Sequence, residues 1–222
     1  MTQKVKFIDE ERSEFFATVR KRVDNYFIEN NITKFANREM VAKTIFFLGA
    51  MVALYTLILT EIFPPAIMLV LAILLGMTMA FIGFNVCHDA LHGSYSANPK
   101  INKGLGLIFN FIGANTYVWG ITHNIVHHTY TNIPGHDEDI EIAPGLIRVA
   151  EEDKVYKIQR YQHIYAFFLY GLASLSWFFR KDYVKFFQKK VGNHINKHPK
   201  IEYFNLFFFK AVYYITFIVV PL

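Results

Sequence analysis

The sequence has little cysteine and two long stretches without charge. Cys87 is the only cysteine, so no intramolecular disulfide can form. Residues 44–60 and 62–87 contain no Asp, Glu, Lys or Arg, and each is close to the length of about 20 apolar residues that crosses a hydrocarbon core. The N-terminal residues carry mixed charge and do not have the pattern of a cleavable signal peptide. We therefore expect the first apolar segment to be retained as an anchor.

The composition supports a membrane protein over a soluble enzyme. Hydrophobic residues make up 53% of the chain, and the mean hydropathy is +0.23. The net charge is +5, but the basic residues flank the apolar segments, where they would face anionic lipid headgroups rather than nucleic acid. The sequence predicts an all-α fold, an integral membrane helical bundle built from a helix hairpin and interfacial helices.

The hairpin is predicted from residues 44–60 and 66–87. Two prolines, at 64 and 65, lie between these segments. Proline ends one helix and can begin the next, so they predict the turn of the hairpin. Seventeen residues reach only about 26 Å, so flanking residues must lengthen the first span. Residues 206–222 begin a third span.

Basic residues predict the orientation. Nine Lys and Arg lie in residues 1–43, six in 88–160 and seven in 180–200, and the turn at Glu61 has none. The positive-inside rule then places the N-terminus and both later regions in the cytoplasm. Residues 164–179 lie between two cytoplasmic regions and are too short to cross twice, so we expect a re-entrant or interfacial helix. We expect the same of the glycine-rich residues 105–119.

Residues 1–43 are predicted to form a cytoplasmic amphipathic N-terminal arm, and residues 44–222 the membrane domain. Apolar residues recur in the arm at roughly helical spacing, with charges on the other side: Phe7, Phe15, Phe16, Val19, Val23 and Phe27. Such a helix can lie on a membrane surface, and the alternative is a flexible tail.

Five of the nine histidines form two clusters. His88 and His92 are four residues apart, so a helix places both imidazoles on one face. His123 and His127 have the same spacing, whereas the adjacent His128 is expected about 100° away, toward a second metal or the far side of the first. Neutral imidazole binds iron, copper, zinc and nickel. The two clusters predict a metal site at the mouth of the hairpin.

Other polar residues near the clusters are candidates to support them. Metal-bound imidazoles usually donate their second N–H to a carboxylate or carbonyl. The candidate supporting residues are Asp89, Asn124, His136 and Asp137, with Glu138, Asp139 and Glu141 as further carboxylates. His136 is also a possible further ligand. The alternative for residues 135–139 is a solvated acidic loop, and the isolated His163, His194 and His198 are expected to be ordinary histidines.

These motifs together resemble those of the membrane fatty acid desaturase family. HDALH follows the apolar hairpin, HNIVHHTYTN follows about 30 residues later, and GHDEDIE comes next. The resemblance is closest to the acyl-lipid, front-end branch, which is linoleoyl-CoA desaturase-like. It implies a membrane helix bundle with a cytosolic cap that holds two irons through three histidine boxes. His88 and His92 match the first box, and His123, His127 and His128 match the second.

The family's third box, QxxHH or HxxHH, has no match here. We therefore expect the sequence to be truncated at its C-terminus and the domain at 44–222 to be incomplete.

The resemblance also implies the chemistry. The enzyme would be an O2-dependent non-haem di-iron oxidoreductase that introduces a double bond into an acyl-CoA or acyl-lipid. A His-Pro-Gly-Gly haem motif is missing, so a separate electron donor of the ferredoxin or cytochrome type is expected, and no nucleic acid. Residues 105–119 and 164–179 are candidates for the acyl channel. Trp119 and Trp177 belong either to that channel or to an aromatic belt.

Three alternatives remain open from the sequence. A related histidine-box hydroxylase or ketolase would use similar ligands. A membrane haem protein would need two histidines facing each other across the haem, which the clustering disfavours. A non-catalytic fragment is the third, because the third box is missing.

Overall fold

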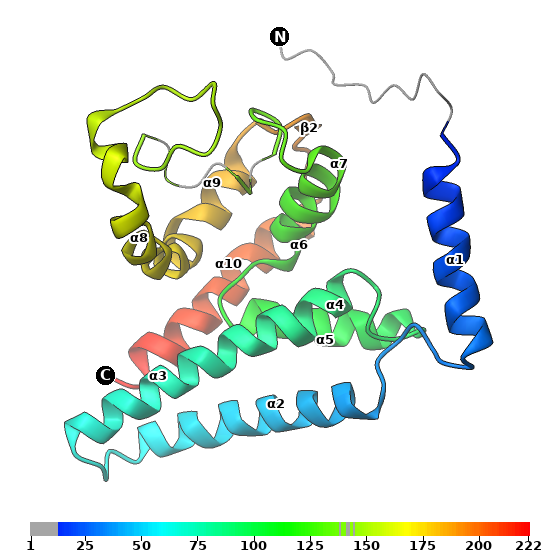
Figure 1. Cartoon of the computed structure of the whole chain (residues 1–222). Coiled ribbons are helices and arrows are strands. Elements are labelled where there is room, and N and C mark those ends of the chain that lie inside the picture. Colours follow the sequence, from blue (N-terminus) through cyan, green and yellow to red (C-terminus); the bar gives the residue numbers. More distant parts are fainter. Residues whose placement is uncertain (1–12, 138, 141–142, 144) are drawn as a thin grey trace.

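The computed structural model describes residues 13–137, 139–140, 143 and 145–222 (Figure 1). It is mainly helical, as predicted. The helices and strands are α1 (Phe15–Glu29), α2 (Arg38–Leu59), α3 (Pro65–Phe81), α4 (His88–Leu91), α5 (Pro99–Phe111), α6 (Thr116–Trp119), α7 (His128–Tyr130), α8 (Gln162–Ser176), α9 (Asp182–Phe187), β1 (Lys190–Val191), β2 (His194–Ile195) and α10 (Lys200–Tyr214). A 3-10 turn spans Lys157–Tyr161, and π-helical segments span Ile82–Cys87, Gly120–His127, Trp177–Lys181 and Ile215–Val219.

The predicted hairpin is formed by α2 and α3, which lie side by side (Figure 1). Helix α2 begins at Arg38, six residues earlier than predicted, because the Asn37 side chain caps it by accepting a hydrogen bond from the amide of Met40. Pro65 occupies the first turn of α3. The second helix continues through the π-helical segment and α4, so that Pro65–Leu91 is one run of 27 residues. Both helices are therefore longer than the hydropathy pattern predicted.

A third long helix runs from Lys200 to Val219. Its predicted start at residue 206 was late, because Pro199 precedes the helix and its first turn is polar. Near the C-terminus it meets α2, where the Tyr55 hydroxyl donates to the carbonyl of Thr216 and the rings of Tyr55 and Phe217 lie 5.3 Å apart. In the described residues, three helices are long and apolar enough to cross a membrane: Arg38–Leu59, Pro65–Leu91 and Lys200–Val219.

The two expected interfacial segments differ from each other. Residues 164–179 lie in α8 and the π-helical segment after it. This stretch is not one of the three helices long and apolar enough to cross a membrane. Residues 105–119 are not one helix. The helix breaks at Gly113, whose φ of +99° is a backbone conformation that glycine adopts readily and other residues rarely do. The Asn110 side chain bridges the break by accepting a hydrogen bond from the amide of Thr116. Their placement at a membrane interface stays a prediction.

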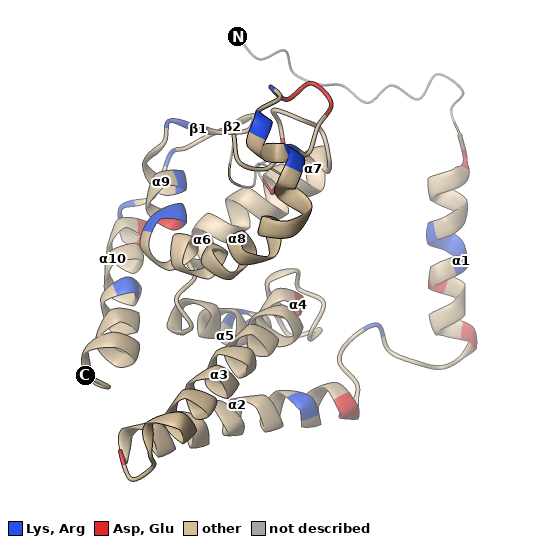
Figure 2. Cartoon of the chain, turned by 60° about the vertical axis from the view of Figure 1, so that its left-hand side comes forward, with Lys and Arg blue, Asp and Glu red and all other residues tan. Residues whose placement is uncertain are grey.

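The buried core lies next to the histidines, at the end of the hairpin where α2 begins and α3 continues into α4. This end is called the inner end of the hairpin. Ile82, Val86 and Cys87 are fully buried against α5 and Trp119. Away from this end, α2 and α3 expose apolar side chains, such as Phe46, 67% exposed, as expected for surfaces that face lipid. Figure 2 shows charged residues on α2 only near its start, and none on α3. The turn between the two helices carries Glu61, and α4 carries Asp89.

A buried ion pair joins α10 to the helices around the core. The Lys210 ammonium lies 2.8 Å from the Asp182 carboxylate, and both side chains are almost completely buried. It also donates to the carbonyl oxygens of Gly113 at 2.7 Å and Phe178 at 3.1 Å. Asp182 in turn accepts from the indole N–H of Trp177 at 3.0 Å. One charge pair therefore connects α10, α9, the end of α8 and the α5–α6 turn.

We predict that Lys210→Met destabilises the protein by about 3–5 kcal/mol, because it leaves the Asp182 carboxylate buried without its counter-ion. Lys210→Met combined with Asp182→Leu should be much closer to the wild type, because no charge is then left unpaired. Thermal unfolding in detergent measures both. Lys200→Met, on an exposed position of the same helix, is the control. Equal stability of the single and double variants would contradict the role of this pair.

Candidate metal centre

The first histidine pair lies where the long second helix ends. His88 begins α4 directly after the π-helical segment, and His92 follows its last residue. The Nε2 atoms of the two rings are 3.2 Å apart and the ring centroids 4.4 Å. The i, i+4 spacing therefore brings the two rings together, as predicted.

The second cluster lies on a π-helical segment, Gly120–His127, that continues from α6. The Asn115 side chain caps α6 by accepting from the amide of Val118. The rings of His123 and His127 stack 4.9 Å apart. His128 is 4.8 Å from His123, so the prediction that it points about 100° away was wrong. A π-helical turn pairs residues five apart, and this wider turn brings His128 back beside His123.

The structure brings all five predicted histidines into one cluster with His123 at its centre. The ring of His123 is 5.6 Å from that of His88 and 5.4 Å from that of His92, and His92 is 4.8 Å from His128. Two groups of donor atoms could each hold a metal ion, with atoms within 4.8 Å of one another: His88, His92 and His123, and His123, His127 and Asp139. Their role as ligands stays a prediction.

Two carboxylates accept hydrogen bonds from the Nδ1 atoms of the second cluster. Asp137, whose side chain is completely buried, accepts from Nδ1 of His127 at 2.9 Å and from the backbone amides of Asn132 and Asp139. Asp139 accepts from Nδ1 of His123 at 2.9 Å. With Nδ1 occupied, Nε2 is the nitrogen left for a metal on each ring. The alternative of a merely solvated acidic loop is wrong for these two residues, while Glu138 and Glu141 lie outside the described residues.

The other candidate supporting residues have different surroundings. The Asp89 carboxylate is 3.5 Å from Nδ1 of His88. The side-chain amide of Asn124 donates to the carbonyl of Leu91 at 3.1 Å, which ties the second cluster to the end of the first. His136 belongs to neither donor group of the described residues. Its Nδ1 accepts instead from Asn193 at 3.1 Å, so the structure gives no support to the possibility that it is a further ligand.

One isolated histidine has a structural contact. His198 stacks on Phe186 with ring centroids 4.1 Å apart, and its nitrogens lie within hydrogen-bond distance of the Tyr117 hydroxyl and the Phe186 carbonyl. His163, His194 and His198 are absent from both donor groups found among the described residues.

The surroundings favour the neutral, metal-binding form of His92 and His128. Burial, with the neighbouring imidazoles adding to it, lowers the pKa of His92 to about 4. The same causes lower the pKa of His128. Burial of Asp139 opposes its charge, but the hydrogen bond from His123 and the ammonium of Lys181 at 3.6 Å bring its pKa below the ordinary value. The neutral form is thus favoured for His92 and His128, and the ionised form for the Asp139 carboxylate.

An apolar cavity of about 330 Å³ leads to His88. Both segments expected to form an acyl channel contribute to it, through Phe109 and Trp119 from the first and Trp177 from the second. Trp119 is 8% exposed and stacks on His123 with centroids 4.4 Å apart, so the aromatic-belt alternative is wrong for it. A smaller cavity of about 240 Å³ adjoins the same wall on the side of Lys181.

Sequence reasoning missed three charged residues that support this wall, at the end of the π-helical segment after α8, in α9 and in α10. Lys181 and Asp182 look like ordinary surface charges in a basic stretch. Lys210 carried a usable signal, because it is the only charge in residues 206–222 and a charge in an apolar helix needs a partner. The sequence does not say which carboxylate that partner is.

The chain resembles known proteins over most of its length. A profile of the fatty acid desaturase family matches residues 64–222. The chain is 34% identical over 194 residues to an sn-1 linoleoyl-lipid 6-desaturase of Synechocystis, covering 86% of this chain and 53% of that protein. It is 31% identical to an acyl-lipid (8-3)-desaturase of Physcomitrium patens, covering 92% and 43%. The chain thus spans about half the length of these relatives, and no solved structure matches it.

We predict that Asp137→Asn weakens iron(II) binding about 10–100-fold, because the amide no longer fixes the tautomer of His127. Asp139→Asn should act similarly through His123. Iron content after equilibration with buffered iron(II) measures both. Asp24→Asn, on the distant α1, is the matched control, and unchanged iron content in both site variants would show that these carboxylates do not support a metal.

Proposed function

Because this chain belongs to the fatty acid desaturase family, we propose that it takes part in introducing a double bond into a fatty acyl chain. One observation carries the proposal. Five imidazoles from two separate histidine boxes form one cluster, and His88 of that cluster lines an apolar cavity between helices that are long enough to cross a membrane. A metal cluster beside an apolar cavity suits chemistry on an unactivated acyl chain.

The donor set fits iron. Neutral imidazoles with a carboxylate are ligands that iron accepts, and Asp137 and Asp139 supply the outer hydrogen bonds that metal-bound histidines usually have. The two donor groups share His123, whose single free Nε2 binds one ion, so the proposal of two ions rests on the resemblance to the desaturase family and not on the overlap of these groups. When bound, the irons would supply the activation of O2 that no amino-acid side chain provides.

The chain's own residues have three tasks in this proposal. Asp137 and Asp139 hold the imidazoles in the tautomer that presents Nε2. Trp119 and Trp177 form the wall beside His88 and keep water from the acyl chain. The cavity positions the acyl chain, so that one pair of carbons lies near the histidines.

The relatives support the choice of reaction and substrate. Each relative named above is described as a desaturase acting on a lipid-linked acyl chain, which favours desaturation over hydroxylation or ketolation. We propose an acyl-lipid or acyl-CoA as substrate. A haem protein is disfavoured because neighbouring rings of the cluster lie 4.4–5.6 Å apart, which leaves no space for a macrocycle between neighbours.

We further propose that the histidines and the N-terminus face the cytoplasm, with residues 1–43 as an arm and 44–222 as the membrane domain. Arg38 and Lys43 lie near the start of α2, and the Lys43 ammonium donates to the side chain of Asn85, three residues before His88. The turn at Glu61 has no basic residue, and Figure 2 shows basic residues on α2 only near its start. A separate ferredoxin or cytochrome would deliver electrons from that side.

We predict that, in a full-length version that carries a third histidine box, His127→Ala abolishes the formation of unsaturated acyl chains while leaving membrane insertion unchanged, because it removes one donor of the second group. Gas chromatography of the lipids of an expressing host measures the product. His163→Ala, an exposed histidine of α8, is the control. Wild-type amounts of product in the His127 variant would remove the second box from the site.

The cavity makes a second prediction. Gly76 lines it, and a Cβ there would meet no atom within 4 Å. Gly76→Leu should therefore fold and shorten the cavity, shifting the products toward shorter acyl chains. Gly49→Leu, at a similarly open glycine of α2 outside the cavity, is the control. An unchanged product distribution would show that the acyl chain does not occupy this cavity.

A further inference from the structure

Helix α1 carries an apolar face that the rest of the described chain leaves uncovered. At 100° per residue, six apolar and aromatic side chains share about one third of its circumference: Phe15, Phe16, Val19, Val23, Tyr26 and Phe27. Phe15 and Phe16 are each 74% exposed. Leaving so many aromatic side chains in water is unfavourable, and contiguous exposed apolar surface marks an interaction site.

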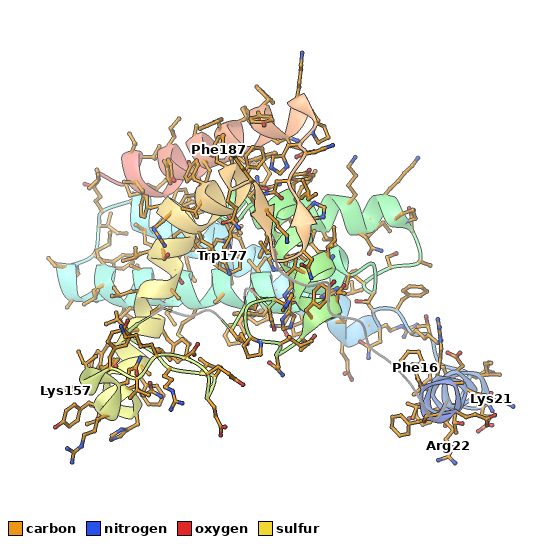
Figure 3. The ribbon with its side chains drawn as sticks, turned by 90° about the horizontal axis from the view of Figure 1, so that it is seen from above. Phe16, Lys21, Arg22, Lys157, Trp177 and Phe187 are labelled. Atoms are coloured by element: carbon orange, nitrogen blue, oxygen red, sulfur yellow. The ribbon has the colours of Figure 1, made fainter. Side chains whose placement is uncertain are left out.

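Basic residues flank this face. On the same helical projection, Arg20 lies about 20° beyond one edge of the apolar arc and Arg22 about 20° beyond the other. Lys21 lies on the opposite side, where Ile28 is the one large apolar residue. Figure 3 looks along α1 and shows Phe16 leaving the helix toward the rest of the chain, whereas Lys21 points away. Apolar residues flanked by arginines match the boundary between acyl chains and anionic headgroups.

The connection to α2 places α1 at the inner end of the hairpin. The amide of Ala36 donates to the carbonyl of Tyr95 at 3.0 Å, and the hydroxyls of Thr44 and Tyr95 lie 2.8 Å apart. These contacts hold the connector beside the loop that follows His92. The axis of α1 lies across the axes of α2 and α3 in both views (Figures 1 and 3). If α2 and α3 cross a bilayer, α1 runs along its surface.

We propose that α1 binds the surface of an anionic bilayer, with its apolar face among the upper acyl chains and Arg20 and Arg22 against lipid phosphates. The proposal is independent of catalysis and of the metal site. It depends on α2 spanning the membrane, because the short connector then keeps α1 within reach of the headgroups. A second copy of the chain could also cover this face, and the experiment must separate the two.

Single-cysteine labelling tests the proposal in the full chain. Cys87 is the only cysteine and is completely buried, so Cys87→Ala gives a background for Val19→Cys and Val23→Cys on the apolar face. Lys21→Cys and Asn25→Cys, on the polar face of the same helix, are the matched controls. Each variant is labelled with an environment-sensitive fluorophore in nanodiscs of phosphatidylcholine with phosphatidylglycerol, each disc holding one chain.

We expect labels at 19 and 23 to show blue-shifted emission and quenching by nitroxides attached to the lipid acyl chains, and labels at 21 and 25 to show neither. Phosphatidylglycerol should increase the fraction of chains whose α1 is bound to the bilayer. Changing Arg20 and Arg22 to Gln should reduce this increase in the binding equilibrium by about 5-fold per arginine. Water-like emission at all four positions would overturn the proposal. So would protection of 19 and 23 that appears only in discs holding two chains, which would assign the face to a second copy.

Discussion

Polar groups buried beneath the apolar helices need partners, and this constraint accounts for much of how the chain is arranged. An unpaired charge or amide in such surroundings costs several kcal/mol. The Lys210–Asp182 pair satisfies it by joining α10 to α9. Asp137 satisfies it by accepting from His127 and from two backbone amides. The Lys210–Asp182 pair also connects distant parts of the chain, whereas Asp137 fixes the loop next to its own histidine box.

The π-helical turns have a specific consequence for the histidines. Residues 82–87 and 120–127 both depart from α-helical geometry immediately before or within a histidine box, and π-helical turns often occur at functional sites. In the second box the wider turn brings His128 beside His123 and His92. All five rings then belong to one cluster rather than to two faces. The two boxes can therefore contribute donors to the same metal site.

The histidine cluster and the apolar cavity share a wall, which relates the proposed chemistry to the membrane. Trp119 stacks on His123 and lines the cavity, and Trp177 is held in the same wall by its hydrogen bond to Asp182. An acyl chain that enters between the long helices would reach the imidazoles without crossing water. Helix α1 at the inner end of the hairpin would face the headgroups of the same lipid leaflet.

Local patterns in the sequence determined the helical class, the three long apolar helices and the two histidine boxes, because charge-free length and i, i+4 spacing depend only on neighbouring residues. The ends of the helices were predicted less well, since the Asn37 cap and Pro199 outweigh hydropathy there. Only the tertiary structure decided that His128 turns toward His123, that His136 pairs with Asn193 and that Lys210 finds Asp182. Each depends on a turn geometry or on residues far apart in the chain, which a hydrophobic or histidine pattern does not encode.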